Sequence, residues 1–402
     1  MRGRKRFLGM NVYDAARMRI ALIFETFPRV YVSFSGGKDS SVMLHLCAEA
    51  ARRYRKKFGL LFIDWECQYA LTIRHVEQMI DLYRDVIDLY WCCVPLRTVN
   101  AVSVFEPEWV AWEEGKQWIR SKPEFAIRDG HYFPFYQKNM TFEEFVPEFG
   151  EWYARKMMTA CMVGIRTSES LNRWMTLNNS CKQMFRRRRW TTRCSRYVYN
   201  IYPLYDWRTE DIWTYCGKFG KCYNELYDRF YQAGVPLHRM RICEPFGNEQ
   251  RQALNLFQVI EPDTWGRMVA RVNGANFGSQ YAKERGLILG NHHITKPDSR
   301  TWKEFALQLL SSMPPATAEH YKNKFAVYLH WWQTKGDYPN GIPDEQEGDS
   351  GAADVPSWRR LCKCLLKNDY WCKMLCFAPT KTASYQNYCN LMKRRREQWK
   401  LI

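Results

Sequence analysis

Ser33-Phe34-Ser35-Gly36-Gly37-Lys38-Asp39-Ser40 is the stretch of sequence that decides the fold of this chain. The apolar run at 29–32 comes before it and predicts a short buried strand, and residues 41–48 follow it with the pattern of a helix. A strand, a glycine-rich turn and a helix N-terminus together form a phosphate site, because the first N–H groups of the helix have no partner within the helix.

The residues of this loop are suited to hold an anion. The two glycines allow the backbone to approach closely, the serines add hydroxyl groups, and Lys38 adds a positive charge. Asp39 would repel a bare phosphate, so it indicates either a bound divalent cation such as Mg²⁺ or a helix cap. The predicted phosphate-binding residues are Ser33, Ser35, Gly36, Gly37, Lys38, Asp39 and Ser40.

Two commoner phosphate loops are excluded. A Walker A loop requires a glycine where Val32 stands, and the dinucleotide fingerprint requires a third glycine where Ser40 stands. The pattern instead resembles the Ser-Gly-Gly-x-Asp-Ser loop of the PP-loop ATP pyrophosphatases. That superfamily also contains the phosphoadenosine phosphosulfate (PAPS) reductases and the small subunit of the bacterial ATP sulfurylase.

Strands and helices alternate beyond the loop. Strands are predicted at 59–64 and 86–94, and helices from the loop to about residue 57 and over 70–84. This alternation predicts an α/β fold with a doubly wound, mostly parallel sheet. In such sheets ligands bind at the carboxyl ends of the strands, where the phosphate loop also lies.

The chain divides into two parts at the sequence level. We expect a nucleotide-binding domain at 1–235 and a mostly helical region at 236–402, with an exposed loop at about 335–355 that is rich in Gly, Asp, Glu and Pro. Within the first part, residues 99–159 form an aromatic-rich insertion that interrupts the alternation. Such an insertion is either a lid that shapes a substrate pocket or a structural cover.

Two acidic residues follow the second predicted strand. In the PP-loop families the end of this strand lies beside the adenosine, so the resemblance implies that Asp64 and Glu66 contact ribose, adenine or metal. The alternative is that an acidic residue at the strand end caps the next helix.

A third motif supports the resemblance. Residues 161–166 predict a strand that leads into Gly164-Ile165-Arg166-Thr167-Ser168-Glu169-Ser170, which resembles the Gly-x-Arg-x-x-Glu-Ser motif of PAPS reductases. Arg166 at a strand end can grip phosphate or sulfate oxygens with two parallel hydrogen bonds. Glu169 would orient Arg166 or cap the helix, and Arg173 would lie further along the same face. The resemblance assigns Gly164, Arg166, Glu169 and Arg173 to the nucleotide site, with Lys38, Asp39 and Arg166 as catalytic residues.

A fourth motif completes the series in the expected order. Residues 203–213 match the Pro-Leu-x-x-Trp-x-x-x-Asp-Ile-Trp segment of PAPS reductases and the sulfurylase subunit. We interpret this segment as structural, with Asp206 as its one candidate site residue.

The net charge of +18 allows two interpretations. A basic surface favours anionic partners, including nucleic acid, or it is simply solvated. Both remain open for the basic stretches 182–196 and 393–396, and the sequence alone does not decide whether either binds nucleic acid. No apolar run reaches the length of a membrane span, and the polar residues after the basic N-terminus argue against export, so we expect a cytoplasmic protein.

The 15 cysteines are odd in number and scattered, which is typical of reduced thiols. Cys243 follows two nearby arginines, Arg239 and Arg241, and is the candidate reactive thiol, with an inert buried cysteine as the alternative. Zinc is not expected, because the spacing of the C-terminal cysteines fits no standard zinc motif. These are Cys362, Cys364, Cys372, Cys376 and Cys389.

The whole chain resembles a bacterial group of PAPS-reductase-family proteins that includes the immunoglobulin-binding regulator A (IbrA) type. Members are often encoded beside a ParB/sulfiredoxin-like protein, which implies such a protein as a partner. One departure is that the Glu-Cys-Gly-Leu-His tail of thioredoxin-dependent PAPS reductases does not occur in this sequence.

Three functional classes follow from the resemblance. The first is an enzyme that binds ATP with Mg²⁺ and cleaves it between the α- and β-phosphates to adenylate an acceptor. The second is a PAPS-type reductase or sulfotransferase that uses a thiol. The third is a regulatory protein that senses an adenine nucleotide.

Overall fold

The chain divides into two compact units in the computed structural model, each of them discontinuous in sequence. One unit comprises Met1–Leu96, Ala111–Glu244 and Ile260–Thr264, and the other comprises Arg97–Val110, Pro245–Val259 and Trp265–Ile402. The structure describes residues 9–103, 106, 108–138, 140–178, 182–242, 244–247, 253–272, 275, 294–313, 315–334, 338–349, 355–366, 372 and 375. The predictions for Cys243, Cys376, Cys389 and 393–396 lie outside these residues.

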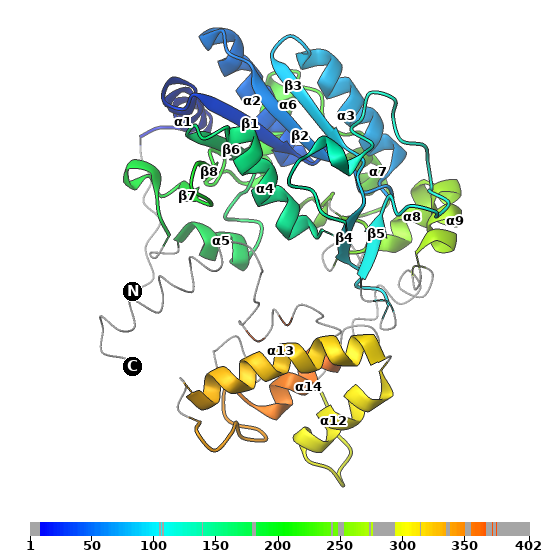
Figure 1. Ribbon diagram of the computed structural model, residues 1–402. Coiled ribbons are helices and arrows are strands. Elements are labelled where there is room, and N and C mark those ends of the chain that lie inside the picture. The colour runs from blue at the N-terminus through cyan, green and yellow to red at the C-terminus, as the bar shows by residue number, and fades with distance from the viewer. Residues whose placement is uncertain are drawn as a thin grey trace. The chain divides into compact units, whose positions relative to one another are not determined.

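A six-stranded sheet forms the core of the first unit (Figure 1). Its strand order is β3-β2-β1-β6-β8-β7, and every described pairing is parallel except that of β7 with β8. The strands are β1 (Arg29–Phe34), β2 (Phe58–Ile63), β3 (Ile87–Cys92), β6 (Thr159–Val163), β7 (Thr191–Arg193) and β8 (Val198–Ile201). The predicted mostly parallel α/β sheet is confirmed.

The central strand β1 brings three loops to one edge of the sheet. Val32 is in register with Leu60 of β2 and with Met162 of β6. Because the three strands are parallel, the segments after β1, β2 and β6 all leave at the carboxyl edge. The phosphate loop follows β1, so its neighbours are the segments that follow β2 and β6.

Helices cover both faces of this sheet, as its buried side chains require. Tyr31 of β1 packs against Phe149 and Tyr153, whereas Phe34 packs against His75. Alternate residues of a strand point to opposite faces, so the helices that carry these partners lie on opposite sides. The helices of this unit are α1 (Val12–Thr26), α2 (Lys38–Tyr54), α3 (Ala70–Tyr83), α4 (Phe142–Ala154), α5 (Leu171–Asn178), α6 (Thr209–Lys218) and α7 (Leu226–Gln232).

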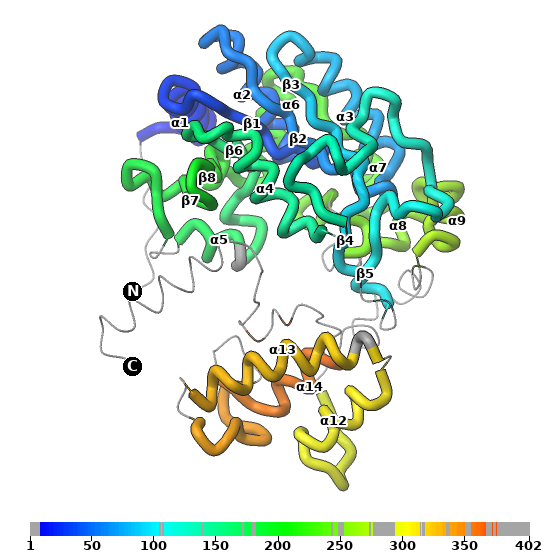
Figure 2. Tube along the Cα trace, viewed as in Figure 1, coloured from blue at the N-terminus to red at the C-terminus, as the bar shows by residue number. Residues whose placement is uncertain are grey.

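The aromatic-rich insertion contributes α4 to one face of the six-stranded sheet. It contains β4 (Leu96–Val99), β5 (Glu108–Ala111), a 3₁₀ turn at Gly130–Tyr132 and α4, which can be followed along the chain in Figure 2. The buried hydroxyl of Tyr153 in α4 donates to the carbonyl of Val30 (2.9 Å) and accepts the N–H of Gly59 (3.0 Å). The sequence predicts that the insertion is either a lid over a substrate pocket or a structural cover. For α4, these contacts agree with a structural cover.

Helices also make up most of the second unit. Helices α12 (Trp302–Ser312), α13 (Pro315–Thr334) and α14 (Trp358–Leu366) share one core, with Tyr321, Phe325 and Leu361 among its buried members. The chain also forms α8 (Leu254–Ile260) and α9 (Pro262–Arg271). The predicted helical C-terminal region is confirmed.

The loop expected to be exposed at about 335–355 is partly packed where the structure describes it, over 338–349. Ile342 and Asp349 are buried, and the Asp344 carboxylate accepts the N–H groups of Trp302 and Lys303 at the start of α12 (3.0 and 2.9 Å). The prediction is wrong there because this carboxylate provides the acceptor for unpaired helix N–H groups. The described cysteines of this unit, Cys362, Cys364 and Cys372, are buried.

Neither a metal cluster nor a membrane-spanning helix occurs among the described residues. Within them, no three His, Cys, Asp or Glu side chains lie together where they could hold a metal ion. No helix within the described part of the chain combines the length and the apolar character needed to cross a membrane.

Close packing at Gly164 gives a first prediction. A Cβ at this position would lie 2.9 Å from both the carbonyl carbon and the carbonyl oxygen of Asp39. Because backbone atoms cannot move aside as a flexible side chain can, we expect Gly164→Ala to lower the free energy of unfolding by about 1–3 kcal/mol. Urea unfolding measures this change.

The matched control is Gly217→Ala in α6, where an added Cβ meets nothing within 4 Å. That substitution should leave stability unchanged or raise it by up to about 1 kcal/mol, because alanine favours a helix over glycine. Equal stability of the Gly164→Ala variant and the wild type would show that β6 and α2 are not in close contact.

Candidate functional site

The phosphate loop is held in shape by its own side chains. Ser40 Oγ accepts the N–H of Ser35 (3.3 Å) and donates to the carbonyl of Gly37 (3.0 Å), and Ser35 Oγ accepts the N–H of Gly37 (3.4 Å). Gly36 has a φ of +71°, in the left-handed region that glycine adopts without strain. Helix α2 starts at Lys38, directly after these turns.

Asn224, which precedes α7, supports the loop from outside. Its side-chain amide donates to the carbonyl of Gly36 (3.0 Å) and to Thr72 Oγ1 (3.1 Å), and the residue is fully buried. Sequence reasoning missed Asn224, since no motif marks a residue that lies 188 positions from its partner.

Lys38 places its ammonium group inside the site. Nζ lies 3.3 Å from a carboxylate oxygen of Asp39 and donates to the carbonyl of Met240 (3.0 Å). Burial lowers the pKa of Lys38, and the Asp39 carboxylate acts in the opposite direction. The backbone N–H of Lys38 donates to the hydroxyl of Tyr227 (3.0 Å).

Arg166, after β6, reaches across to the loop after β1. Its side chain is only 3 % exposed, and its Nε donates to the carboxylate of Asp39. One terminal nitrogen also donates to Ser168 Oγ (3.1 Å) and to Thr209 Oγ1 (3.3 Å). The buried guanidinium group therefore fixes the end of β6 to the start of α2.

Glu169 links Arg166 to two further arginines. Its carboxylate accepts the N–H of Arg166 (3.1 Å) and pairs with Arg173, and its carbonyl accepts from Arg241. Glu169 lies in the loop between β6 and α5, since α5 begins only at Leu171. The predicted association of Arg166, Glu169 and Arg173 is present.

We call the connected charged residues at this edge the phosphate-loop cluster. Four cations and two carboxylates are present, which leaves an excess of positive charge at the N-terminus of α2. An arrangement of this kind favours a bound anion with several oxygens. The members are Lys38, Asp39, Arg166, Glu169, Arg173 and Arg241.

Mg²⁺ does not fit Asp39 as the structure places it. One of its carboxylate oxygens faces the guanidinium of Arg166, and the other faces the ammonium of Lys38. A metal ion bound directly to this carboxylate would lie against two positive charges. The structure thus gives Asp39 the role of an anchor for two cations.

Asp64 and Glu66 are engaged inside the protein. Asp64 accepts from the indole of Trp91 (2.8 Å) and from Arg120, and Glu66 accepts the N–H of Trp112 (2.6 Å). Both residues are buried. Their carboxylates hold the segment around 112–120 to the end of β2, so in this conformation neither is available to a ribose or a metal ion.

The alternative role for these acids, a cap on the next helix, is wrong, whereas their predicted role at the nucleotide stays a prediction. The cap residue of α3 is Tyr69, and the first helix N–H groups, of Ala70 and Leu71, donate to the carboxylate of Glu261 (3.0 and 3.3 Å).

The other predicted residues have structural positions. Ser33 lies within β1, where it pairs with Leu61 and Val163. Asp206 forms a two-point ion pair with Arg19 of α1 (2.8 and 2.6 Å). Its carboxylate therefore ties α1 to the segment before α6.

The basic stretch 182–196 lies at the β7 edge of the sheet. Phe185 and Trp190 are buried, and the four arginines between them are exposed. This placement matches a solvated basic loop held at both ends by aromatic side chains.

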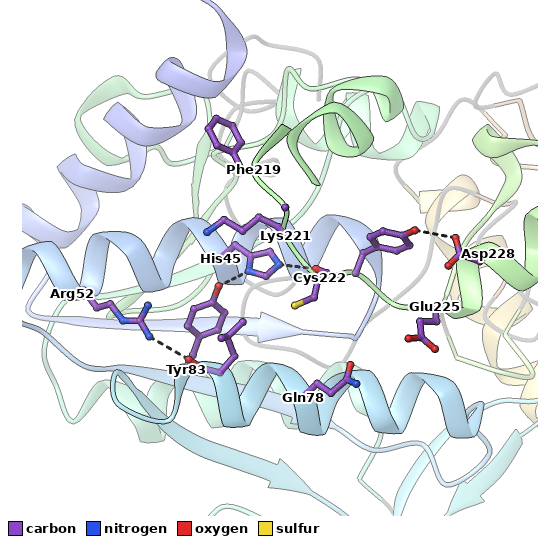
Figure 3. A pocket seen from close by; sticks show the side chains of 12 residues that line it. His45, Arg52, Gln78, Tyr83, Phe219, Lys221, Cys222, Glu225 and Asp228 are labelled. Carbon is purple, nitrogen blue, oxygen red and sulfur yellow. Dashed lines mark hydrogen bonds between the residues drawn. The ribbon is translucent and has the colours of Figure 1, made fainter. Parts of the chain in front are cut away.

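A groove of about 780 Å³ lies between α2, α3 and the segment that joins α6 to α7 (Figure 3). His45 borders it, with its ring nitrogens bonded to the hydroxyl of Tyr83 and the carbonyl of Cys222. Burial lowers the pKa of His45 to about 4, so the ring is neutral at pH 7. Sequence reasoning did not single out this groove, because its lining comes from three separate segments.

A parallel sheet whose central strand ends in a cationic phosphate loop defines an α/β domain built to hold an anion. Residues 29–233 match the phosphoadenosine phosphosulfate reductase domain family, and the chain belongs to that family. This match confirms the predicted relationship to PAPS reductases. Residues 234–344 and 340–386 match a domain of unknown function, DUF3440.

A relative and two solved structures illustrate the range of similarity. The Escherichia coli (strain K12) "Uncharacterized protein YbdN" is 50% identical over 398 residues, 98% of this chain and 97% of that protein. A PAPS reductase from Candida auris, in a phosphate complex, is 15% identical, covering 56% of this chain and 94% of its own, with a TM-score of 0.29. The FMN adenylyltransferase of Candida glabrata, in complex with FAD and inorganic pyrophosphate, is 16% identical. The match covers 54% of this chain and 59% of that chain, with a TM-score of 0.34.

Two buried histidines of α2 and α3 predict how stability depends on pH. Burial lowers the pKa of His75 to about 4, as it does for His45. The unfolded chain therefore binds more protons than the folded one between about pH 6.5 and pH 4, and folding stability falls as the pH falls through this window. We expect a loss of about 3–4 kcal/mol between pH 7 and pH 5, somewhat under 2 kcal/mol for each histidine.

Urea unfolding at the two pH values measures this loss. In a His75→Gln variant the free energy of unfolding should differ less between pH 7 and pH 5 than in the wild type, because one of the two histidines is absent. The same pH dependence in the variant and the wild type would contradict the assignment of the loss to these histidines.

Proposed function

We propose that this protein is an enzyme that binds an adenine nucleotide at the phosphate-loop cluster and cleaves ATP between its α- and β-phosphates. The acceptor forms a bond to the α-phosphorus while the bond from that phosphorus to the bridging oxygen breaks, and pyrophosphate leaves. The observation that carries this proposal is the convergence of Lys38 and Arg166 on Asp39 at the N-terminus of α2.

Different residues of the site would hold different parts of the nucleotide. The N–H groups of Gly37 and Lys38 and the Lys38 ammonium would hold the departing pyrophosphate, where negative charge develops. Arg166 would bind an oxygen of the α-phosphate or of the acceptor with its other terminal nitrogen, which lies 3.8 Å from a carboxylate oxygen of Glu169. Asp39 would hold both cations in position.

Sulfonucleotide reduction or sulfate transfer is the second candidate, favoured by the family match over 29–233. Reduction requires a reactive thiolate. Among the cysteines that the structure describes, burial raises the pKa of several, including Cys161 to about 12 and Cys216 to about 11. A raised pKa disfavours the thiolate at neutral pH, so Cys161 and Cys216 are poor candidates for the reducing thiol.

Calorimetric titration with ATP and with PAPS, each with and without Mg²⁺, combined with a pyrophosphate-release assay, tests the proposal. We expect ATP to bind and pyrophosphate to appear. Lys38→Ala should weaken ATP binding by roughly 10- to 100-fold, because it removes a charged hydrogen-bond donor from a buried site. Arg166→Gln should lower turnover together with affinity.

The matched control is Arg84→Ala, which removes a cation from an exposed ion pair with Asp81 and should leave binding and turnover at wild-type values. Thermal unfolding of each variant shows whether the fold is retained. Binding of PAPS without pyrophosphate release, and release of sulfite in the presence of a thiol reductant, would replace the first candidate with the second.

A further inference from the structure

The N–H and ammonium donors of Lys38 already have acceptors within the protein. The backbone N–H of Lys38 donates to Tyr227, and its ammonium donates to the carbonyl of Met240. An oxyanion bound by this loop would accept the same hydrogen bonds. Two protein oxygens therefore stand where phosphate oxygens are expected.

The residues from Leu237 to Ile242, here called the closing segment, supply one of these oxygens. A Cβ placed on Gly37 would lie 3.5 Å from the hydroxyl of Tyr227 and 3.8 Å from the carbonyl of Ile242. The segment thus runs directly over the glycine that opens α2. Arg241 holds it to the carbonyl of Glu169 in the phosphate-loop cluster.

The closing segment itself is weakly anchored. Its 3₁₀ turn, Leu237–Arg239, buries none of its residues, and Leu237 is 47% exposed. Only Met240 is buried in the segment. Segments with few buried apolar contacts open at a lower free energy than the core of a protein.

We propose that the closing segment and the Tyr227 hydroxyl of α7 together cover the phosphate loop, and that nucleotide phosphates displace this cover by taking the places of the Tyr227 hydroxyl and the Met240 carbonyl. The inference rests on the proposed nucleotide site and adds a regulation of that site. The free protein is then held closed by its own hydrogen bonds, and apparent affinity is reduced by the fraction of molecules that are closed.

Tyr227→Phe tests the cover, because it removes the hydroxyl and keeps the ring. Loss of one hydrogen bond from the closed state should tighten ATP binding about fivefold by calorimetry. The matched control is Tyr231→Phe, one turn further along α7, where the side chain is 69% exposed and affinity should not change. Weaker binding by Tyr227→Phe would overturn the proposal and make Tyr227 a phosphate ligand.

Hydrogen exchange measured by mass spectrometry gives a second readout. In the free protein, Tyr227→Phe should speed exchange in peptides that cover 35–40 and 237–242. Saturating ATP should slow exchange in the wild-type loop and speed it in the closing segment. Slower exchange in both segments would show that the segment clamps the nucleotide, and would overturn the cover.

Inorganic pyrophosphate separates failure of the cover from failure of the proposed function. If the wild type binds neither ATP nor PAPS, the proposed function fails. If the Tyr227→Phe variant then binds pyrophosphate and the wild type does not, the cover is still supported. If neither protein binds pyrophosphate, both the cover and the proposed function are overturned.

Discussion

The ion pair between Arg166 and Asp39 is the interaction on which the site depends. It joins the segment after β6 to the first turn of the helix that follows β1, and both side chains are largely withdrawn from water. Removing one partner of a buried pair leaves the other charge uncompensated, at a cost of roughly 3–5 kcal/mol. Asp39 also faces Lys38, so a single carboxylate positions two cations at the carboxyl edge of the sheet. The tight approach of Gly164 to Asp39 is what permits this pairing.

The other acidic residues at that edge of the sheet are paired with hydrogen-bond donors of their own. Asp64 and Glu66 leave the neighbouring strand at the same edge, yet they accept hydrogen bonds from Trp91, Arg120 and Trp112. Their negative charge is therefore compensated within the protein, and the phosphate-loop cluster keeps its net positive charge. Asn224 holds the loop carbonyl at Gly36, so the loop is shaped before any ligand arrives, which lowers the entropy that binding must overcome.

Local motifs predicted the parallel sheet, the phosphate loop and the association of Arg166 with Glu169, because each depends on residues close together in sequence. The roles of Asp64 and Asp206 could not be predicted in this way. Their partners, Arg120 and Arg19, lie 56 and 187 positions away, and only the folded chain brings them together. The same holds for Tyr227 and Met240, which reach Lys38 from 189 and 202 positions away.

A crystal structure with a non-hydrolysable ATP analogue is the most direct test of the central claim that the phosphate-loop cluster is the nucleotide site. We expect β- and γ-phosphate oxygens within hydrogen-bonding distance of the N–H groups of Gly37 and Lys38, with Arg166 still paired to Asp39. A nucleotide seated in the groove beside His45, with Tyr227 still bonded to Lys38, would contradict it.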